Sequence, residues 1–129
     1  MTHKPMILYY DNGQEEKQKT LEKSIQHMGI SVVPILPSHF HQTVGYLAKI
    51  KGFPPRKISP LENQPVISAE IMILCNFREA QLDALLAGMK SGKIPHVPLK
   101  AVLTAQNCFW TLVQLFQELE EEHQSFYSE

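Results

Sequence analysis

The sequence predicts a single α/β domain built on a small, mainly parallel four-stranded sheet with helices packed on it. Short apolar runs alternate with helix-favouring amphipathic segments in β-α-β-α-β-α-β-α order. A chain of 129 residues with 43% hydrophobic content is long enough to bury the core of one domain. Alternation of this kind favours right-handed crossovers between parallel strands.

The first half, residues 1–53, predicts two strands and two helices. The apolar run "MILYY" ends at the turn signal 11–13, and Leu21 and Ile25 then recur at helical spacing. Pro34 lacks an N–H and places the second strand at a sheet edge or at a strand end. Gly45 costs the second helix about 1 kcal/mol relative to alanine. The elements are expected at residues 6–10, 14–28, 30–35 and 39–50.

A proline-rich stretch, residues 54–65, is the clearest internal boundary in the chain. It holds Pro54, Pro55, Pro60 and Pro65. Proline cannot donate to a sheet, and it disfavours helix at the residue before it. We therefore expect an exposed loop with no strand or helix of its own, joining residues 1–53 to residues 66–129 within one domain.

The second half repeats the pattern. Strands are expected near 68–75 and 98–104, and helices over 78–91 and 107–125. Gly92 is typical of a helix C-terminus, and Asn107 is a typical N-cap. The apolar face of the last helix comprises Phe109, Leu112, Val113, Phe116 and Leu119. Aligning "ILYYDNG" with "IMILCNF" reveals little beyond the shared pattern, so the residues alone do not support a duplication.

Several stretches of the second half carry a family resemblance. They are "MILCNF", Leu82-x-x-Leu85-Leu86, "IPHVPLKAVLT", Asn107-x-x-Trp110-Thr111-Leu112 and "ELEEEH". Together they resemble the bacterial domain of unknown function 3783, found mostly in small Firmicutes proteins, over about residues 66–125. The resemblance implies a small α/β domain in a family without an established activity, and it supplies no catalytic residues.

Composition argues against several classes of partner. Twelve basic and thirteen acidic residues give a net charge of -1 and a pI near 6.6, with no general attraction to nucleic acid or anionic membranes. Apolar runs of about four residues fall far short of a membrane span. The N-terminus lacks the pattern of a secretory signal, and two cysteines are too few for a disulfide framework. We expect a cytoplasmic protein with reduced thiols.

Polar residues follow several of the predicted strands. Asn12, Asn76 and Thr104 stand at strand ends, and Asn107 begins the last helix. In open parallel sheets, ligands bind beyond the carboxyl ends of the strands, and a helix N-terminus there favours an anion. These four residues are the predicted ligand site. The alternative is structural, because Asn107 is the expected N-cap and Thr104 a common strand-end residue.

Other reactive residues favour structural roles. Lys100 is expected to reach solvent or to pair with Glu70, and a functional amine is the alternative. It would lie about 13 Å from Thr104 along the strand and is excluded from the predicted site. Cys75 and Cys108 are expected to be buried and inert. The pair His39-x-His41 has no nearby Cys or carboxylate, so neither a metal nor a cofactor is expected.

Three functions remain open. The first is a non-enzymatic regulatory or interaction module, because no catalytic motif is present. The second is an anion- or nucleotide-binding protein using the strand-end residues. The third is a degenerate receiver-like domain, with Asp11 and Thr104 at strand ends and Asn76 where a phosphorylated aspartate would be needed. A second copy of the chain or another protein is the expected partner, with no nucleic acid and no membrane.

Overall fold

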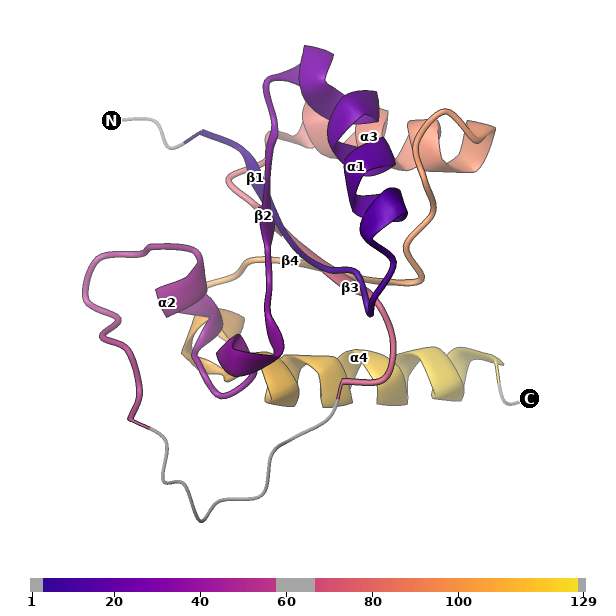
Figure 1. The fold of residues 1–129 in the computed structure, drawn as a ribbon. Helices are drawn as coiled ribbons and strands as arrows, with labels where there is room; N and C mark the ends of the chain where they lie inside the picture. The colour runs from indigo at the N-terminus through magenta and orange to yellow at the C-terminus, as the bar shows by residue number, and fades with distance from the viewer. Residues whose placement is uncertain (1–3, 58–66, 128–129) are drawn as a thin grey trace.

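A four-stranded sheet lies between two layers of helices (Figure 1). The computed structural model describes residues 4–57 and 67–127. The strands are β1 (Met6–Tyr10), β2 (Ser31–Pro34), β3 (Ile71–Cys75) and β4 (Leu99–Val102). The helices are α1 (Glu15–Ile25), α2 (Val44–Leu47), α3 (Glu79–Ser91) and α4 (Leu112–Tyr127). Short 3-10 turns are η1 (Gln26–Met28), η2 (Pro37–His39) and η3 (Asn107–Phe109).

The sheet is mixed, and the prediction of a mainly parallel sheet is wrong. Its order is β2-β1-β3-β4, and the two central strands run antiparallel, with Leu8 opposite Ile73. Only the outer pairs, β1 with β2 and β3 with β4, are parallel. Within each half, a helix connects two parallel strands, as the alternation predicts. Between the halves the direction changes, because β3 pairs antiparallel with β1 and Ile71, its first residue, lies opposite Tyr10, the last residue of β1.

Two apolar clusters hold the layers together. On one face of the sheet, Ile7, Tyr9, Met72 and Leu74 pack against Leu21 and Ile25 of α1 and Leu85 and Met89 of α3. On the other face, Leu8, Ile71 and Ile73 pack against Val44 of α2 and Leu112, Leu115 and Phe116 of α4. Both faces of β3 are covered, and all five of its residues are buried. The strand is therefore apolar throughout instead of alternating.

The two halves are related by an approximate two-fold axis through the Leu8–Ile73 pair. Each half is a β-α-β unit followed by a 3-10 turn and a helix. On the helix layer the axis passes an isolated antiparallel bridge between Thr43 and Thr111. There the Val44 N–H donates to the Trp110 carbonyl at 2.8 Å, and the Leu112 N–H donates to the Gln42 carbonyl at 3.0 Å. The structure thus contains an internal repeat that the residues alone did not reveal.

The repeat is broken where the two final helices differ in length. The second helix, expected over 39–50, is only the four residues of α2, whereas α4 has sixteen. The chain leaves α2 through positive φ angles at Lys49 (60°) and Gly52 (97°). Gly45 has a packing role in α2, because a Cβ there would lie 2.7 Å from the Phe53 ring. The ring of Phe53 therefore occupies the space beside the short helix.

The last helix begins later than expected. Asn107 begins η3, and α4 starts at Leu112, where the Thr111 hydroxyl accepts the Gln114 N–H at 3.2 Å. Phe109 consequently lies outside α4 and is 69% exposed. Its expected place on the apolar face was wrong, because the chain turns between η3 and α4 at Trp110, whose backbone is extended.

The proline-rich stretch is described only in part. Residues 54–57 are exposed and have neither helix nor strand, and the rest of the expected loop, 58–65, lies outside the described residues. In the described parts of the chain, every helix is too short or too polar to cross a membrane.

Candidate crevice at the ends of β1 and β2

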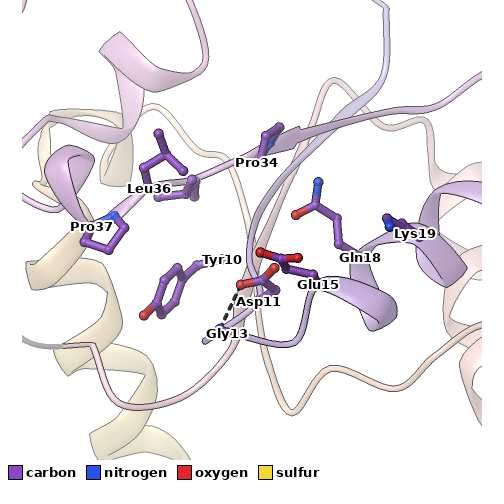
Figure 2. A pocket seen from close by; sticks show the side chains of 10 residues that line it. Tyr10, Asp11, Gly13, Glu15, Gln18, Lys19, Pro34, Leu36 and Pro37 are labelled. Atoms are coloured by element: carbon purple, nitrogen blue, oxygen red, sulfur yellow. Dashed lines mark hydrogen bonds between the residues drawn. The ribbon is translucent and has the colours of Figure 1, made fainter.

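A crevice of about 520 Å³ opens beyond the carboxyl ends of β1 and β2 (Figure 2). It lies between the β1–α1 turn, the first turns of α1 and the residues that follow β2. The lining residues are Tyr10, Asp11, Gly13, Glu15, Gln18, Lys19, Pro34, Ile35, Leu36 and Pro37. Its volume is typical of small-molecule sites, and parallel α/β units bind ligands at this position.

Carboxylates dominate the α1 side of the crevice. The Asp11 Oδ1 accepts the Gly13 N–H at 2.9 Å, and the Asp11 carbonyl accepts the Gln14 N–H at 3.0 Å. Positive φ angles at Asn12 (51°) and Gly13 (85°) form this tight turn. The turn therefore fixes the Asp11 carboxylate beside the start of α1, where Glu15 occupies the first turn. These negative side chains already occupy the positive end of the helix dipole.

Apolar groups form the opposite wall. Pro34, Leu36 and Pro37 come from the end of β2 and from η2, and Leu36 is 54% exposed. The wall is anchored to the sheet, since the Ile35 N–H donates to the Tyr9 carbonyl at 2.8 Å. The Tyr10 ring packs edge-on against Phe40 with centroids 5.0 Å apart. The crevice thus combines an apolar wall with two carboxylates and one amine, that of Lys19.

The mixed sheet separates the four residues of the predicted ligand site. Asn12 follows β1, and its Nδ2 donates to the Ser68 carbonyl at 3.1 Å. Asn76 follows β3 at the opposite edge, and its Nδ2 donates to the Lys4 carbonyl at 3.3 Å. Because β1 and β3 are antiparallel, these two residues lie roughly 20 Å apart along the strands. Thr104 and Asn107 share the edge of Asn76, but not that of Asn12.

Thr104 and Asn107 bond to each other's backbone. The Asn107 Oδ1 accepts the Thr104 N–H at 2.8 Å, and the Thr104 Oγ1 accepts the Asn107 N–H at 2.9 Å. The Asn107 Nδ2 donates to the Val102 carbonyl at 2.9 Å. The first half has the equivalent bond, because the His39 Nδ1 accepts the Leu36 N–H at 3.0 Å. A bond repeated in both halves indicates that these side chains form the turn.

The sequence suggested an ion pair between Glu70 and Lys100, but the structure shows that Glu70 has other partners. Its partners are the Lys17 Nζ at 2.5 Å and the Tyr9 hydroxyl at 2.8 Å. The Lys17 Nζ also donates to the His96 carbonyl at 2.6 Å. Burial and the hydrogen bond to Glu70 raise the pKa of Tyr9 well above its ordinary value. The network joins β1, α1 and the β3 entrance, three segments whose proximity no local pattern indicates.

The Lys100 side chain forms a hydrogen bond with a backbone carbonyl and not with a carboxylate. Its Nζ donates to the Val97 carbonyl at 2.7 Å, and partial burial lowers its pKa because the charged form loses hydration. Both cysteines are buried and unpaired. Burial raises the pKa of the Cys75 thiol to about 12, so the reactive thiolate is suppressed at neutral pH.

The described residues contain no cluster of three or more His, Cys, Asp or Glu side chains suited to a metal ion. Sequence reasoning placed Asp11 and Gly13 at a strand end but missed the other residues of the crevice. The acidic first turn of α1, at Glu15, was the available signal. The apolar wall gave none, because its position depends on β2 lying beside β1.

Comparison with protein families identifies the second half of the chain. Residues 70–126 match the family described as "Domain of unknown function (DUF3783)". The match spans somewhat less than half of the chain. The family resemblance of the second half is thereby confirmed, over nearly the expected range. The DUF3783 segment contains β3, α3, β4 and α4, and the crevice lies in the other half of the repeat. No curated protein and no solved structure matches the chain.

Proposed function

We propose that this protein is a non-enzymatic regulatory module that binds a small organic cation in the crevice beyond β1 and β2. The observation that carries the proposal is the pairing of two carboxylates, Asp11 and Glu15, with an apolar wall in one cavity. Carboxylates attract an ammonium group, and the wall accepts an apolar body. An anion is disfavoured because the same carboxylates already compensate the α1 dipole.

A non-catalytic role is supported by the chemistry of the lining. The ten lining residues include no Ser, Thr, Cys or His, so the crevice has no Ser–His or Cys–His pair for nucleophilic catalysis. The buried Tyr9–Glu70–Lys17 network is occupied by its own contacts. A cytoplasmic location in bacteria belongs to the same proposal, and the free thiols of Cys75 and Cys108 support a reducing compartment.

Titration with a matched pair of probes tests the site. We expect 2-phenylethylammonium to shift the backbone amide NMR signals of residues 11–18 and of Leu36, and its charge-reversed counterpart 3-phenylpropionate to leave them in place. Glu15→Gln should weaken the binding of the cation about threefold, the scale of a solvent-exposed charge pair. Asp83→Asn is the matched control, because Asp83 is an exposed acidic residue of α3 that does not line the crevice. Equal affinity of both variants, or shifts confined to other residues, would rule out the crevice.

An anion site at the other edge remains a second prediction. The parallel pair β3 and β4 ends there, which brings Asn76, Thr104 and Asn107 to one edge. We expect inorganic phosphate to shift the amides of residues 104–108 and Thr104→Val to reduce that effect. Asn107→Ala needs a measurement of folding beside it, because the lost turn bonds cost about 1 kcal/mol. Receiver-like phosphotransfer gains no support, since Asp11 lies at the opposite edge from Asn76 and Thr104.

A further inference from the structure

Opposite charges are segregated on the layer that contains α2 and α4. Residues 23–61 include no Asp or Glu, and residues 101–129 include no Lys or Arg. The exposed cations are Lys49, Lys51, Arg56 and Lys57, here called the basic segment. The exposed anions are Glu118, Glu121 and Glu122, here called the acidic stripe. Among the described residues, none of these seven side chains takes part in an ion pair.

The basic segment is held at the N-terminal end of α4. The rings of Phe53 and Phe109 lie 5.1 Å apart. The Gln42 side chain accepts the Arg56 N–H at 2.8 Å and donates to the Arg56 carbonyl at 3.2 Å. The Arg56 guanidinium also donates to the His41 carbonyl at 3.1 Å. These contacts fix part of the positive charge beside the η3 turn, before α4 begins.

The acidic stripe lies farther along the same helix. Leu112, Leu115 and Phe116 face the sheet, so the exposed side of α4 carries Gln114, Gln117 and the three glutamates. From Leu112 to Glu121 the helix rises about 14 Å. The acidic stripe therefore lies around the middle of α4, away from its N-terminal end, and the last turn has no basic residue. Figure 1 shows α2 at the opposite end of this layer from the C-terminus.

We infer that this layer is the interface of a homodimer in which the basic segment of each copy lies against the acidic stripe of the other. A two-fold axis across α4 pairs the helices antiparallel and makes both charge contacts at once, as an isologous interface requires. Phe109, 69% exposed, supplies an apolar anchor beside the charges. The net charge of -1 offers little long-range repulsion between copies. The inference is independent of the crevice.

Sedimentation velocity of the full chain tests the dimer. We expect a dimer at about 0.05 M salt whose dissociation constant rises at least tenfold at about 0.5 M salt, because screening weakens exposed charge pairs. Lys49→Glu/Lys51→Glu and Glu118→Lys/Glu121→Lys should each abolish the dimer, since each variant opposes like charges. Lys90→Glu/Lys93→Glu, exposed positions on or just after α3, should dimerise as the wild type does.

Mixing the two charge-reversed variants is the decisive measurement. In the mixed pair both contacts again join opposite charges, so we expect a one-to-one heterodimer that neither variant forms with itself. Circular dichroism of each variant alone verifies that it is folded. A mixture that stays monomeric overturns the antiparallel arrangement. A wild type that stays monomeric at low salt overturns the homodimer. The same holds if the monomer binds a single-stranded oligonucleotide through its basic segment.

Discussion

Phe116→Ala is expected to lower the free energy of unfolding by about 3 to 5 kcal/mol, enough to unfold a large fraction of a marginally stable domain. Phe116 is 5% exposed and packs in the cluster that joins α4 to the sheet. Removing the ring deletes buried apolar surface and leaves a cavity that a close-packed interior fills only in part. Denaturant unfolding followed by circular dichroism measures the loss.

Phe109→Ala is the matched control for this prediction. It removes the same ring from a position only seven residues earlier, where the side chain is 69% exposed. We expect a loss below about 1 kcal/mol, because exposed substitutions have small effects. Both variants are compared at high salt, where self-association does not contribute to stability. Equal losses would show that the α4 face does not anchor the sheet.

Glu70→Ala is expected to cost about 3 kcal/mol of unfolding free energy. The substitution leaves the Lys17 ammonium and the buried Tyr9 hydroxyl without the carboxylate that both contact. An unpaired ion in a poorly hydrated site destabilises the fold by more than the ion pair stabilised it, which explains the size of the effect. Equilibrium unfolding at neutral pH gives the difference from the wild type.

Two further variants separate the charge from the hydrogen bonds. Glu70→Gln keeps an acceptor for Tyr9 but loses the negative charge, so we expect a smaller loss than for alanine. Lys17→Met removes the other ion, and combining it with Glu70→Ala should cost less than the two single losses added together. Strict additivity of the two would contradict a coupled pair. Lys19→Met is a control, since Lys19 is exposed and does not contact Glu70.

Predictions from local sequence patterns were most reliable for features that depend only on neighbouring residues, such as helix faces and helix ends. Leu21 and Ile25, four residues apart, face the sheet from α1 as their spacing predicts, and Gly92 ends α3 with a φ of 85°. The alternation of β4 also places Leu99, Ala101 and Leu103 against one cluster, the one on the face of the sheet that α4 covers. Periodicity and glycine conformation act within one or two turns of the chain, so the sequence expresses them directly.

The pairing of strands that are distant in sequence could not be predicted from local patterns. No local pattern indicates that β3 runs antiparallel to β1, because that direction depends on contacts between segments distant in sequence. The antiparallel direction of β3 places Asn12 and Asn76 at opposite edges of the sheet, so the residues of the predicted site are divided between two edges. It also brought Lys17, Tyr9 and Glu70 together, where Lys100 had been the expected partner of Glu70.

By itself, the sequence determined the helices and strands to within a few residues in most cases, most apolar positions of the core and the similarity of residues 70–126 to the DUF3783 family. Tertiary structure alone decided the mixed sheet, the two-fold repeat centred on Leu8 and Ile73, and the crevice at Asp11 and Glu15. The physical reason is that hydrophobic burial and backbone propensity act locally and leave a pattern in the residues. Strand direction depends instead on the packing of segments distant in sequence, where many pairings satisfy the same pattern.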